Sequence, residues 1–151
     1  MNSDKHMIKH FNSSKDLALQ IREEIPYLKM LVLFGSRARG DYREDSDYDF
    51  AVLYDEDLQE SLTKDTPYGF IEAYSVIPKV LGISSDRIDI VNLGHCSDVI
   101  AHFVAQDGKL LYEKEIGCFE QFKQRALMSD RQLYEIQQQI ANRIRTSLAR
   151  R

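Results

Sequence analysis

The chain has 151 residues, of which 43% are hydrophobic and 29% are charged, and its formal net charge is −4. This length suffices for one compact domain with a real core and is short for two. The weak negative charge argues against a chain-wide attraction to nucleic acid or to an anionic membrane. The apolar runs fall well short of the roughly 20 residues of a membrane span, and no secretory signal is visible, so we expect a cytoplasmic protein.

The first predicted elements are a helix and a short strand. Residues 14–27 place apolar side chains at partly helical spacing, Ser13 or Ser14 can cap the N-terminus, and Pro26 marks the end. The short apolar run Leu31–Phe34 predicts a buried strand.

A turn at Gly35 and Ser36 ends this strand and leads to the next one. Residues 37–46 are almost entirely polar and predict a short helical turn and an exposed loop. Tyr48–Tyr54 is apolar on both faces apart from Asp49, which is typical of an interior strand covered on both sides. We expect this strand at the centre of the sheet.

A longer helical pattern follows and leads to a third strand. The pattern is interrupted at Pro67–Gly69, resumes over 70–81 and ends at Gly82. The run Arg87–Leu93 predicts the third strand, in which Asp89 is an isolated acid.

Helical signals return from Ser97 to Gln106, and a short strand over Leu110–Tyr112 is expected to join the edge of the sheet. Beyond Glu115 the pattern is helical to the end of the chain. Five apolar side chains recur there at steps of three and four: Leu133, Ile136, Ile140, Ile144 and Leu148. We expect most of this stripe to pack on the domain itself, and the alternative is docking to a partner or a second copy.

This order of elements favours an α+β (α/β) fold, a small mixed sheet flanked by helices with a C-terminal helical extension. Residues 1–6 show no pattern, so we expect the domain over 7–114 and the extension over 115–151. Cys96 and Cys118 lie far apart without Cys-x-x-Cys spacing, and we expect two reduced structural thiols.

Two carboxylates open the predicted central strand. Because residues two apart on a strand project to the same face, Asp47 and Asp49 point the same way. Their charges repel, so either one pKa rises strongly or a cation lies between them. Asp89 adds a third carboxylate if its strand lies alongside. Carboxylates without His or Cys favour one or two Mg²⁺ ions, with Mn²⁺ as the alternative.

The turn before this strand can bind an anion. Free backbone N–H groups at Gly35 and Ser36 can cradle a phosphate, glycine permits close approach, and Ser36 adds a hydroxyl. Arg37, Arg39 and Arg43 offer counter-charge to a triphosphate. We therefore predict a nucleoside triphosphate that metal ions link to the aspartates, with Gly35, Ser36, Arg37 and Arg39 as the nucleotide-binding residues.

Each signal has a simpler explanation when taken alone. A Gly-Ser pair after a strand is usually just a turn, an Asp-x-Asp pair is often a solvated loop end, and Asp89 could pair with Arg87 or Arg43. A Walker A loop is excluded because Asp41 and Tyr42 replace its Lys-Ser/Thr, and an EF-hand is disfavoured because Phe50 replaces its glycine. The conjunction of the signals favours the site for metal and nucleotide.

The motifs "FGSRARG", "SDYDFAVL" and "DIVNL" together resemble the nucleotidyltransferase superfamily of DNA polymerase β type, over residues 15–112. The small size resembles the minimal nucleotidyltransferases (MNT), antitoxins that are paired with HEPN toxins. The resemblance implies that Asp47 and Asp49 hold two magnesium ions, and that Asp89 holds one of them and helps to deprotonate the attacking hydroxyl. Gly35 and Ser36 would contact the triphosphate.

The same resemblance implies an antitoxin of a type VII-like pair, acting as a Mg²⁺-dependent protein adenylyltransferase. It would transfer AMP from ATP to a tyrosine of a cognate HEPN ribonuclease toxin and so inactivate that toxin. The expected partner is the toxin, in a hetero-oligomer or alongside a homo-oligomer, without direct contact to nucleic acid or membrane. Two alternatives remain: an antitoxin that neutralises by binding alone, and a small-molecule nucleotidyltransferase of the aminoglycoside type.

Overall fold

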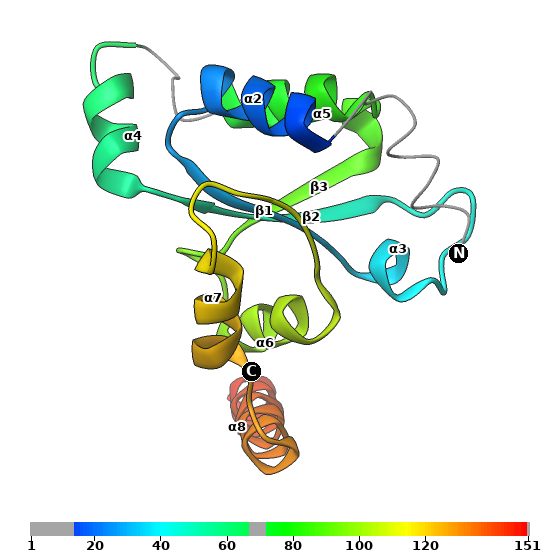
Figure 1. Ribbon diagram of the computed structural model, residues 1–151. Helices are drawn as coiled ribbons and strands as arrows, with labels where there is room; N and C mark the ends of the chain where they lie inside the picture. The colour runs from blue at the N-terminus through cyan, green and yellow to red at the C-terminus, as the bar shows by residue number, and fades with distance from the viewer. Residues whose placement is uncertain (1–13, 67–71, 151) are drawn as a thin grey trace.

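The computed structural model describes residues 14–66 and 72–150, in which helices cover both faces of a four-stranded sheet (Figure 1). The strand order is β3-β2-β1-β4. β1 pairs antiparallel with β2 and β4, whereas β2 and β3 are parallel, so the sheet is mixed and β2 is interior, as the sequence predicts. The strands are β1 (Leu28–Phe34), β2 (Tyr48–Tyr54), β3 (Ile88–Asn92) and β4 (Lys109–Glu113).

The α2 and α5 helices cover one face of the sheet, and α6 and α7 cover the other (Figure 1). The predicted break at Pro67–Gly69, the possible cap at Ser13 and the expected start at Met7 lie outside the described residues. The helices are α2 (Ser14–Glu24), α3 (Ser36–Arg39), α4 (Glu56–Thr63), α5 (Glu72–Leu81), α6 (Asp98–Asp107), α7 (Cys118–Ala126), α8 (Asp130–Ala149) and the 3-10 turn η2 (Ser85–Arg87).

The two layers of helices explain why the strands read as continuous apolar runs. Leu31 and Leu33 of β1 pack with Phe50 into the cluster under α2 and α5. Met30 and Val32, which alternate with them, pack into a second cluster with α6 and α7. Because both faces of β1 and β2 are covered, neither strand needs a polar face. The β1 strand begins at the buried Leu28, three residues before the predicted start at Leu31.

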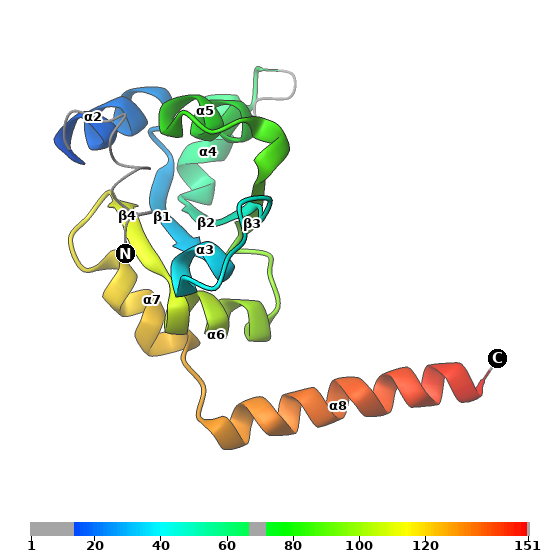
Figure 2. The same cartoon turned by 90° about the vertical axis from the view of Figure 1, so that its right-hand side faces the viewer.

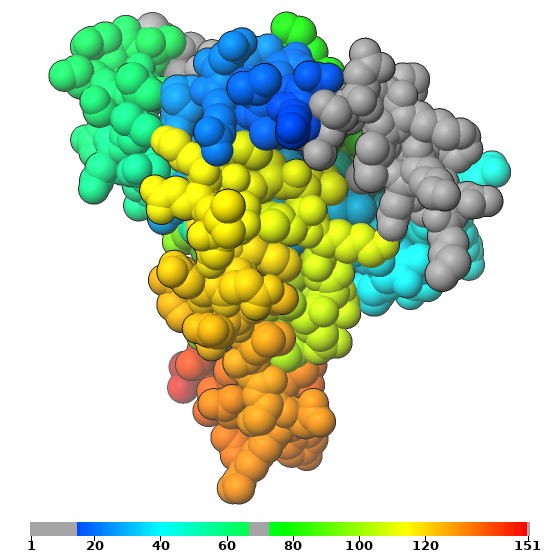
Figure 3. Space-filling view, in the orientation of Figure 1, coloured from blue at the N-terminus to red at the C-terminus, as the bar shows by residue number. Residues whose placement is uncertain are grey.

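The last helix leaves the domain. α8 extends away from the sheet (Figure 2) and forms the narrow lower end of the molecule in the space-filling view (Figure 3). None of its described residues is buried. Leu133 and Ile136 are half-buried, whereas Ile140, Ile144 and Leu148 are 45%, 56% and 60% exposed. The greater part of the predicted stripe thus does not pack on the domain.

The link from α7 to α8 is fixed by a buried histidine. His102 of α6 accepts a hydrogen bond at Nδ1 from the backbone N–H of Met128, at 3.0 Å. Ser129 then caps the N-terminus of α8 with a capping box: its hydroxyl accepts a hydrogen bond from the backbone N–H of Gln132, and the side chain of Gln132 accepts one from the backbone N–H of Ser129. The C-terminal helical pattern is therefore divided into α7 and α8 at residues 127–129.

Both cysteines, Cys96 and Cys118, are free thiols. Within residues 14–66 and 72–150, no helix combines the length and the apolar character that crossing a membrane requires.

Candidate active site

Three aspartates lie at one end of the two parallel strands. Asp47 directly precedes β2, Asp49 belongs to β2, and Asp89 belongs to β3. The register of the parallel pair sets Asp49 opposite Asp89, and residues paired in this way project to the same face of a sheet. Because Phe50 points into the cluster under α2 and α5, Asp49 and Asp89 face the α6 side.

The electrostatics of Asp49 reflect this neighbourhood. Burial raises the pKa of the Asp49 carboxyl, the negative charges of Asp89 and Asp47 raise it further, and the positive charge of Arg39 opposes them. An ionised Asp49 is therefore unfavourable in the absence of a cation, and added positive charge would stabilise all three carboxylates.

The donor set suits a hard divalent cation. Carboxylate oxygens are the ligands that Mg²⁺ and Mn²⁺ prefer, and Asp47, Asp49 and Asp89 supply them from adjacent backbone positions. In the described part of the chain, no three His, Cys, Asp or Glu side chains are so arranged that they could hold a metal ion. The carboxylate type of the three residues and their placement on the sheet suit magnesium, whereas their side chains as they stand do not form such a group.

The turn between β1 and α3 is pressed against Asp49. Gly35 caps α3 with φ 73° and ψ −157°, a conformation that other residues rarely adopt. A Cβ atom added at Gly35 would overlap Oδ2 of Asp49 and lie 3.1 Å from its Cγ. Backbone pairing of Phe34 with Asp49 holds the two segments together, and Ser36 follows as the first residue of α3. The predicted Gly-Ser turn and the predicted carboxylate therefore lie in contact.

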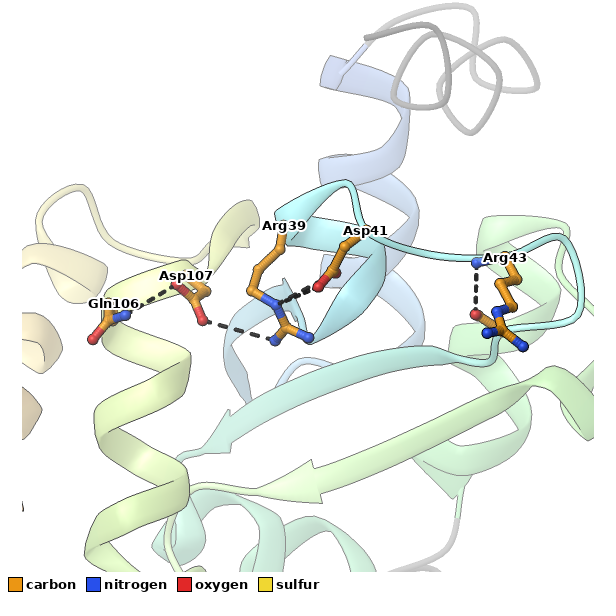
Figure 4. Close-up of polar contacts among 6 residues, drawn as sticks. Arg39, Asp41, Arg43, Gln106 and Asp107 are labelled. Atoms are coloured by element: carbon orange, nitrogen blue, oxygen red, sulfur yellow. Dashed lines mark hydrogen bonds and ion pairs between the residues drawn. The ribbon is translucent and has the colours of Figure 1, made fainter.

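Arg39 lies at the edge of this turn with its charge accessible. Its guanidinium forms ion pairs with Asp41 at 3.4 Å and with Asp107, the last residue of α6, at 3.8 Å (Figure 4). The Arg39 side chain is 45% exposed. Arg43 lies farther along the loop, away from Arg39 (Figure 4). Of these two arginines, Arg39 is the one whose charge acts on Asp49.

Arg37 occupies a different place from the one that the sequence predicts. Its residue is only 8% exposed, and its guanidinium lies 4.2 Å from the ring centre of Tyr42 and 4.4 Å from that of Tyr48. It donates hydrogen bonds to the carbonyl oxygens of Glu44 and Ser46. Tyr48 shares its face of β2 with Phe50, so this guanidinium lies on the face opposite Asp49. The position does not fit a triphosphate contact for Arg37.

Two neighbours of the site were not identified from the sequence. Asp107 was not singled out as a site residue, because its contact with Arg39 joins segments that are distant in the chain. Arg87 was considered only as one of two alternative partners of Asp89, with Arg43, and in the structure it donates to the carbonyl oxygens of Glu44 and Ser46. A local pattern carries no signal for a side chain that binds backbone carbonyls some forty residues away.

Comparisons with known proteins identify a matching family and a similar sequence. The family model "Polymerase beta, Nucleotidyltransferase" matches residues 15–116. The protein adenylyltransferase MntA of Aphanizomenon flos-aquae is 45% identical over 136 residues, which cover 90% of this chain and 91% of that protein.

Two solved structures share the fold. A toxin–antitoxin structure with AMP-PNP has a TM-score of 0.51 at 23% identity and covers 91% of this chain and 98% of the matched chain. A complex of tri-AMPylated Shewanella oneidensis HEPN toxin with MNT antitoxin has a TM-score of 0.51 at 22% identity, with coverages of 90% and 95%. The chain therefore belongs to the polymerase beta nucleotidyltransferase family, as a relative of the MntA protein adenylyltransferases.

Proposed function

We propose that the chain is a Mg²⁺-dependent protein adenylyltransferase, which transfers AMP from ATP to a tyrosine of a HEPN ribonuclease toxin and acts as its antitoxin. The observation that carries the proposal is the alignment of Asp49 with Asp89 beside the Gly35 turn. The names of its relatives support it: one is a protein adenylyltransferase, and structures with the same fold hold AMP-PNP or an AMPylated HEPN toxin.

Each residue of the site has a role in this reaction. Gly35 and Ser36 would contact the triphosphate, and the exposed guanidinium of Arg39 would exchange its carboxylate partners for phosphate oxygens. Asp47, Asp49 and Asp89 would hold magnesium. When bound, magnesium would neutralise the charge of the phosphates and of the three carboxylates.

The transfer is an in-line displacement at the α-phosphorus of ATP. The tyrosine oxygen forms a bond to this phosphorus while the bond to the pyrophosphate oxygen breaks, and pyrophosphate leaves with the electron pair. Asp89 would accept the proton that the tyrosine hydroxyl loses. An added AMP brings bulk and negative charge to the toxin, and negative charge near a ribonuclease site opposes the approach of an RNA backbone.

The surface that meets the toxin is assigned to the outer half of α8. Ile140, Ile144 and Leu148 are exposed along one helix, and exposed apolar side chains in a row are typical of protein contact surfaces. Transfer to the toxin would thus combine docking at α8 with chemistry at the aspartates.

Intact mass measurement tests the proposal directly. The chain is incubated with the protein encoded by the neighbouring gene, ATP and Mg²⁺, and the partner is expected to gain the mass of one or more AMP groups. The double variant Asp47→Asn, Asp49→Asn should transfer nothing. Asp57→Asn, which makes the same change on exposed α4, should transfer normally.

The alternatives give different outcomes in the same assay. If the partner gains no mass and the double variant still neutralises it fully, the chain acts by binding alone. If AMP appears on an amino sugar offered without any protein partner, the small-molecule hypothesis replaces the antitoxin hypothesis.

A further inference from the structure

Arg37 is a buried arginine whose guanidinium binds the loop before β2. A buried guanidinium is costly unless hydrogen bonds and favourable charge contacts replace water. Arg37 Nη2 donates to the carbonyl oxygens of Glu44 at 3.1 Å and Ser46 at 2.9 Å, and Nε donates to Ser46 at 3.3 Å. Its Cζ atom lies over the ring of Tyr42, 4.2 Å from the ring centre, and over the ring of Tyr48, 4.4 Å from the ring centre. All of these partners belong to one segment, residues 42–48.

A second arginine converges on the same carbonyl oxygens from another element. Arg87, at the end of η2 and directly before β3, donates through Nη2 to Glu44 and to Ser46, the latter at 3.3 Å. Its guanidinium also lies 5.8 Å from the ring centre of Tyr48. The carbonyl oxygens of Glu44 and Ser46 thus accept hydrogen bonds from arginines of two elements, α3 and η2.

These hydrogen bonds join the three segments that carry the predicted site. Arg37 follows Gly35 by two residues, Arg87 precedes Asp89 by two residues, and Ser46 directly precedes Asp47. Asp47 itself is exposed and lies before the first residue of β2, so strand pairing does not fix it. The carbonyl of Ser46, directly before Asp47, accepts hydrogen bonds from Arg37 and Arg87, and Tyr48, directly after Asp47, pairs with Ile88 of β3.

We propose that Arg37 and Arg87 are positioning residues, which clamp the 42–48 loop so that Asp47 is held beside Asp49 and Asp89. The part of this inference that concerns metal binding rests on the proposed function. The planar guanidinium suits both tasks of the clamp, because it can stack between two rings and donate several hydrogen bonds in its own plane. A lysine can do neither, so Arg37→Lys should fail to restore the clamp.

Hydrogen exchange of the ligand-free, full-length chain tests the clamp without any enzymatic activity. The amides of Arg43 and Ser46 are hydrogen-bonded across the turn of this loop. In Arg37→Met, Arg37→Lys and Arg87→Met, exchange of these two amides should accelerate at least tenfold, while the β1 amides keep their rates. Arg125→Met, which removes an exposed arginine of α7, should change neither. Loop exchange at the wild-type rate in both Arg37→Met and Arg87→Met would overturn the proposal.

Manganese titration then separates positioning from nucleotide binding. With a non-hydrolysable ATP analogue present, Arg37→Met and Arg87→Met should each weaken Mn²⁺ binding about tenfold by electron paramagnetic resonance, with the affinity for the metal-free analogue unchanged. Arg39→Met should lower the affinity for the analogue itself. If Arg37→Met lowers that affinity as much as Arg39→Met does, Arg37 contacts the nucleotide and the positioning role is wrong.

The two experiments distinguish the failure of the clamp from the failure of the proposed function. A wild-type chain that binds neither Mn²⁺ nor the analogue contradicts the proposed function, whereas hydrogen exchange still decides whether the arginines hold the loop. Arg87 is less buried than Arg37, so Arg87→Met provides the same test if Arg37→Met does not fold.

Discussion

Substitution of Gly35 by alanine separates two demands that the structure places on this residue. The first is the backbone conformation, φ 73° and ψ −157°, which costs a residue with a Cβ atom about 1–3 kcal/mol. The second is space, because the new Cβ would overlap Oδ2 of Asp49 and lie 3.3 Å from its Cβ. Asp49 must therefore rotate away from the turn or push the turn outward. We expect lost stability together with lost metal binding.

Gly82→Ala is the matched control. Gly82 follows α5 with φ 67°, and no heavy atom lies within 4 Å of the Cβ that it would gain. Its cost should be that of the left-handed backbone alone, about 1–2 kcal/mol. With a urea m-value of roughly 2 kcal/mol per molar, a loss of 2 kcal/mol lowers the unfolding midpoint by about 1 M, which is easily measured. Mn²⁺ binding should be lost in Gly35→Ala and retained in Gly82→Ala.

Combination with Asp49→Ala tests whether the overlap is the cause. Shortening Asp49 removes the Oδ2 and Cγ atoms that the new Cβ would meet and leaves only the Cβ of residue 49, at 3.3 Å. Gly35→Ala should therefore cost less stability in that background than in the wild type, approaching the cost of Gly82→Ala. The reasoning is refuted if the cost of Gly35→Ala is the same in both backgrounds, or if Gly35→Ala binds Mn²⁺ like the wild type.

Three further predictions concern charge and the α7–α8 link. Burial and like charges raise the pKa of Asp49, so its ionisation costs stability as pH rises through that value; metal-free Asp49→Asn should resist urea better than the wild type at neutral pH, and the difference should vanish at acid pH. Arg39→Met should weaken binding of an ATP analogue about tenfold in calorimetry. Its free energy of unfolding should change by less than about 1 kcal/mol, because the Arg39 side chain that pairs with Asp41 and Asp107 is exposed. His102→Leu leaves the partly buried Met128 amide without its acceptor and should lower the free energy of unfolding in urea by about 1–3 kcal/mol.

The sheet was predictable where a local pattern determines the structure. Tyr48–Tyr54 is apolar at successive positions because β2 is interior and covered by helices on both faces, and the sequence shows this directly. The approach of Asp89 to Asp49 was predicted only on the condition that their two strands lie alongside each other, and the parallel pairing of β2 with β3 meets that condition. The helix over Asp98–Asp107 was predictable from its cap at Ser97, whose side chain accepts the amide of Ile100.

The roles of the arginines were not predictable, because they depend on which face of β2 each side chain reaches. Arg37 and Arg39 are two residues apart in "GSRARG" and looked equivalent as counter-charge for phosphate. On the four-residue α3 they point to different surroundings: Arg37 contacts two tyrosine rings, and Arg39 forms ion pairs with Asp41 and Asp107. Composition near a motif therefore identifies a cluster of basic residues without showing which of them is exposed and accessible to a ligand.

The stripe on the last helix illustrates a second limit. Leu133 to Leu148 has the spacing of a helix that packs on its own domain, but spacing specifies only that one face is apolar. Which surface covers that face depends on the direction of the helix, which the link at residues 127–129 and its bond to His102 determine. No periodicity in the helix itself encodes that direction.

Several features at this end of the sheet each oppose stability. Gly35 adopts a backbone conformation that other residues rarely adopt, Asp49 is partly buried among like charges, and the charged side chain of Arg37 is buried away from water. A fold selected for stability alone would have no reason to gather them within a few residues of one another, because an apolar replacement of a buried charge is often neutral or stabilising. Strain and unfavourable charge that collect at one place are typical of functional sites, where a ligand relieves them. Asp49 connects two of these costs, since it limits the space at Gly35 and bears the raised pKa, so a cation bound there would offset the charge without removing the need for glycine.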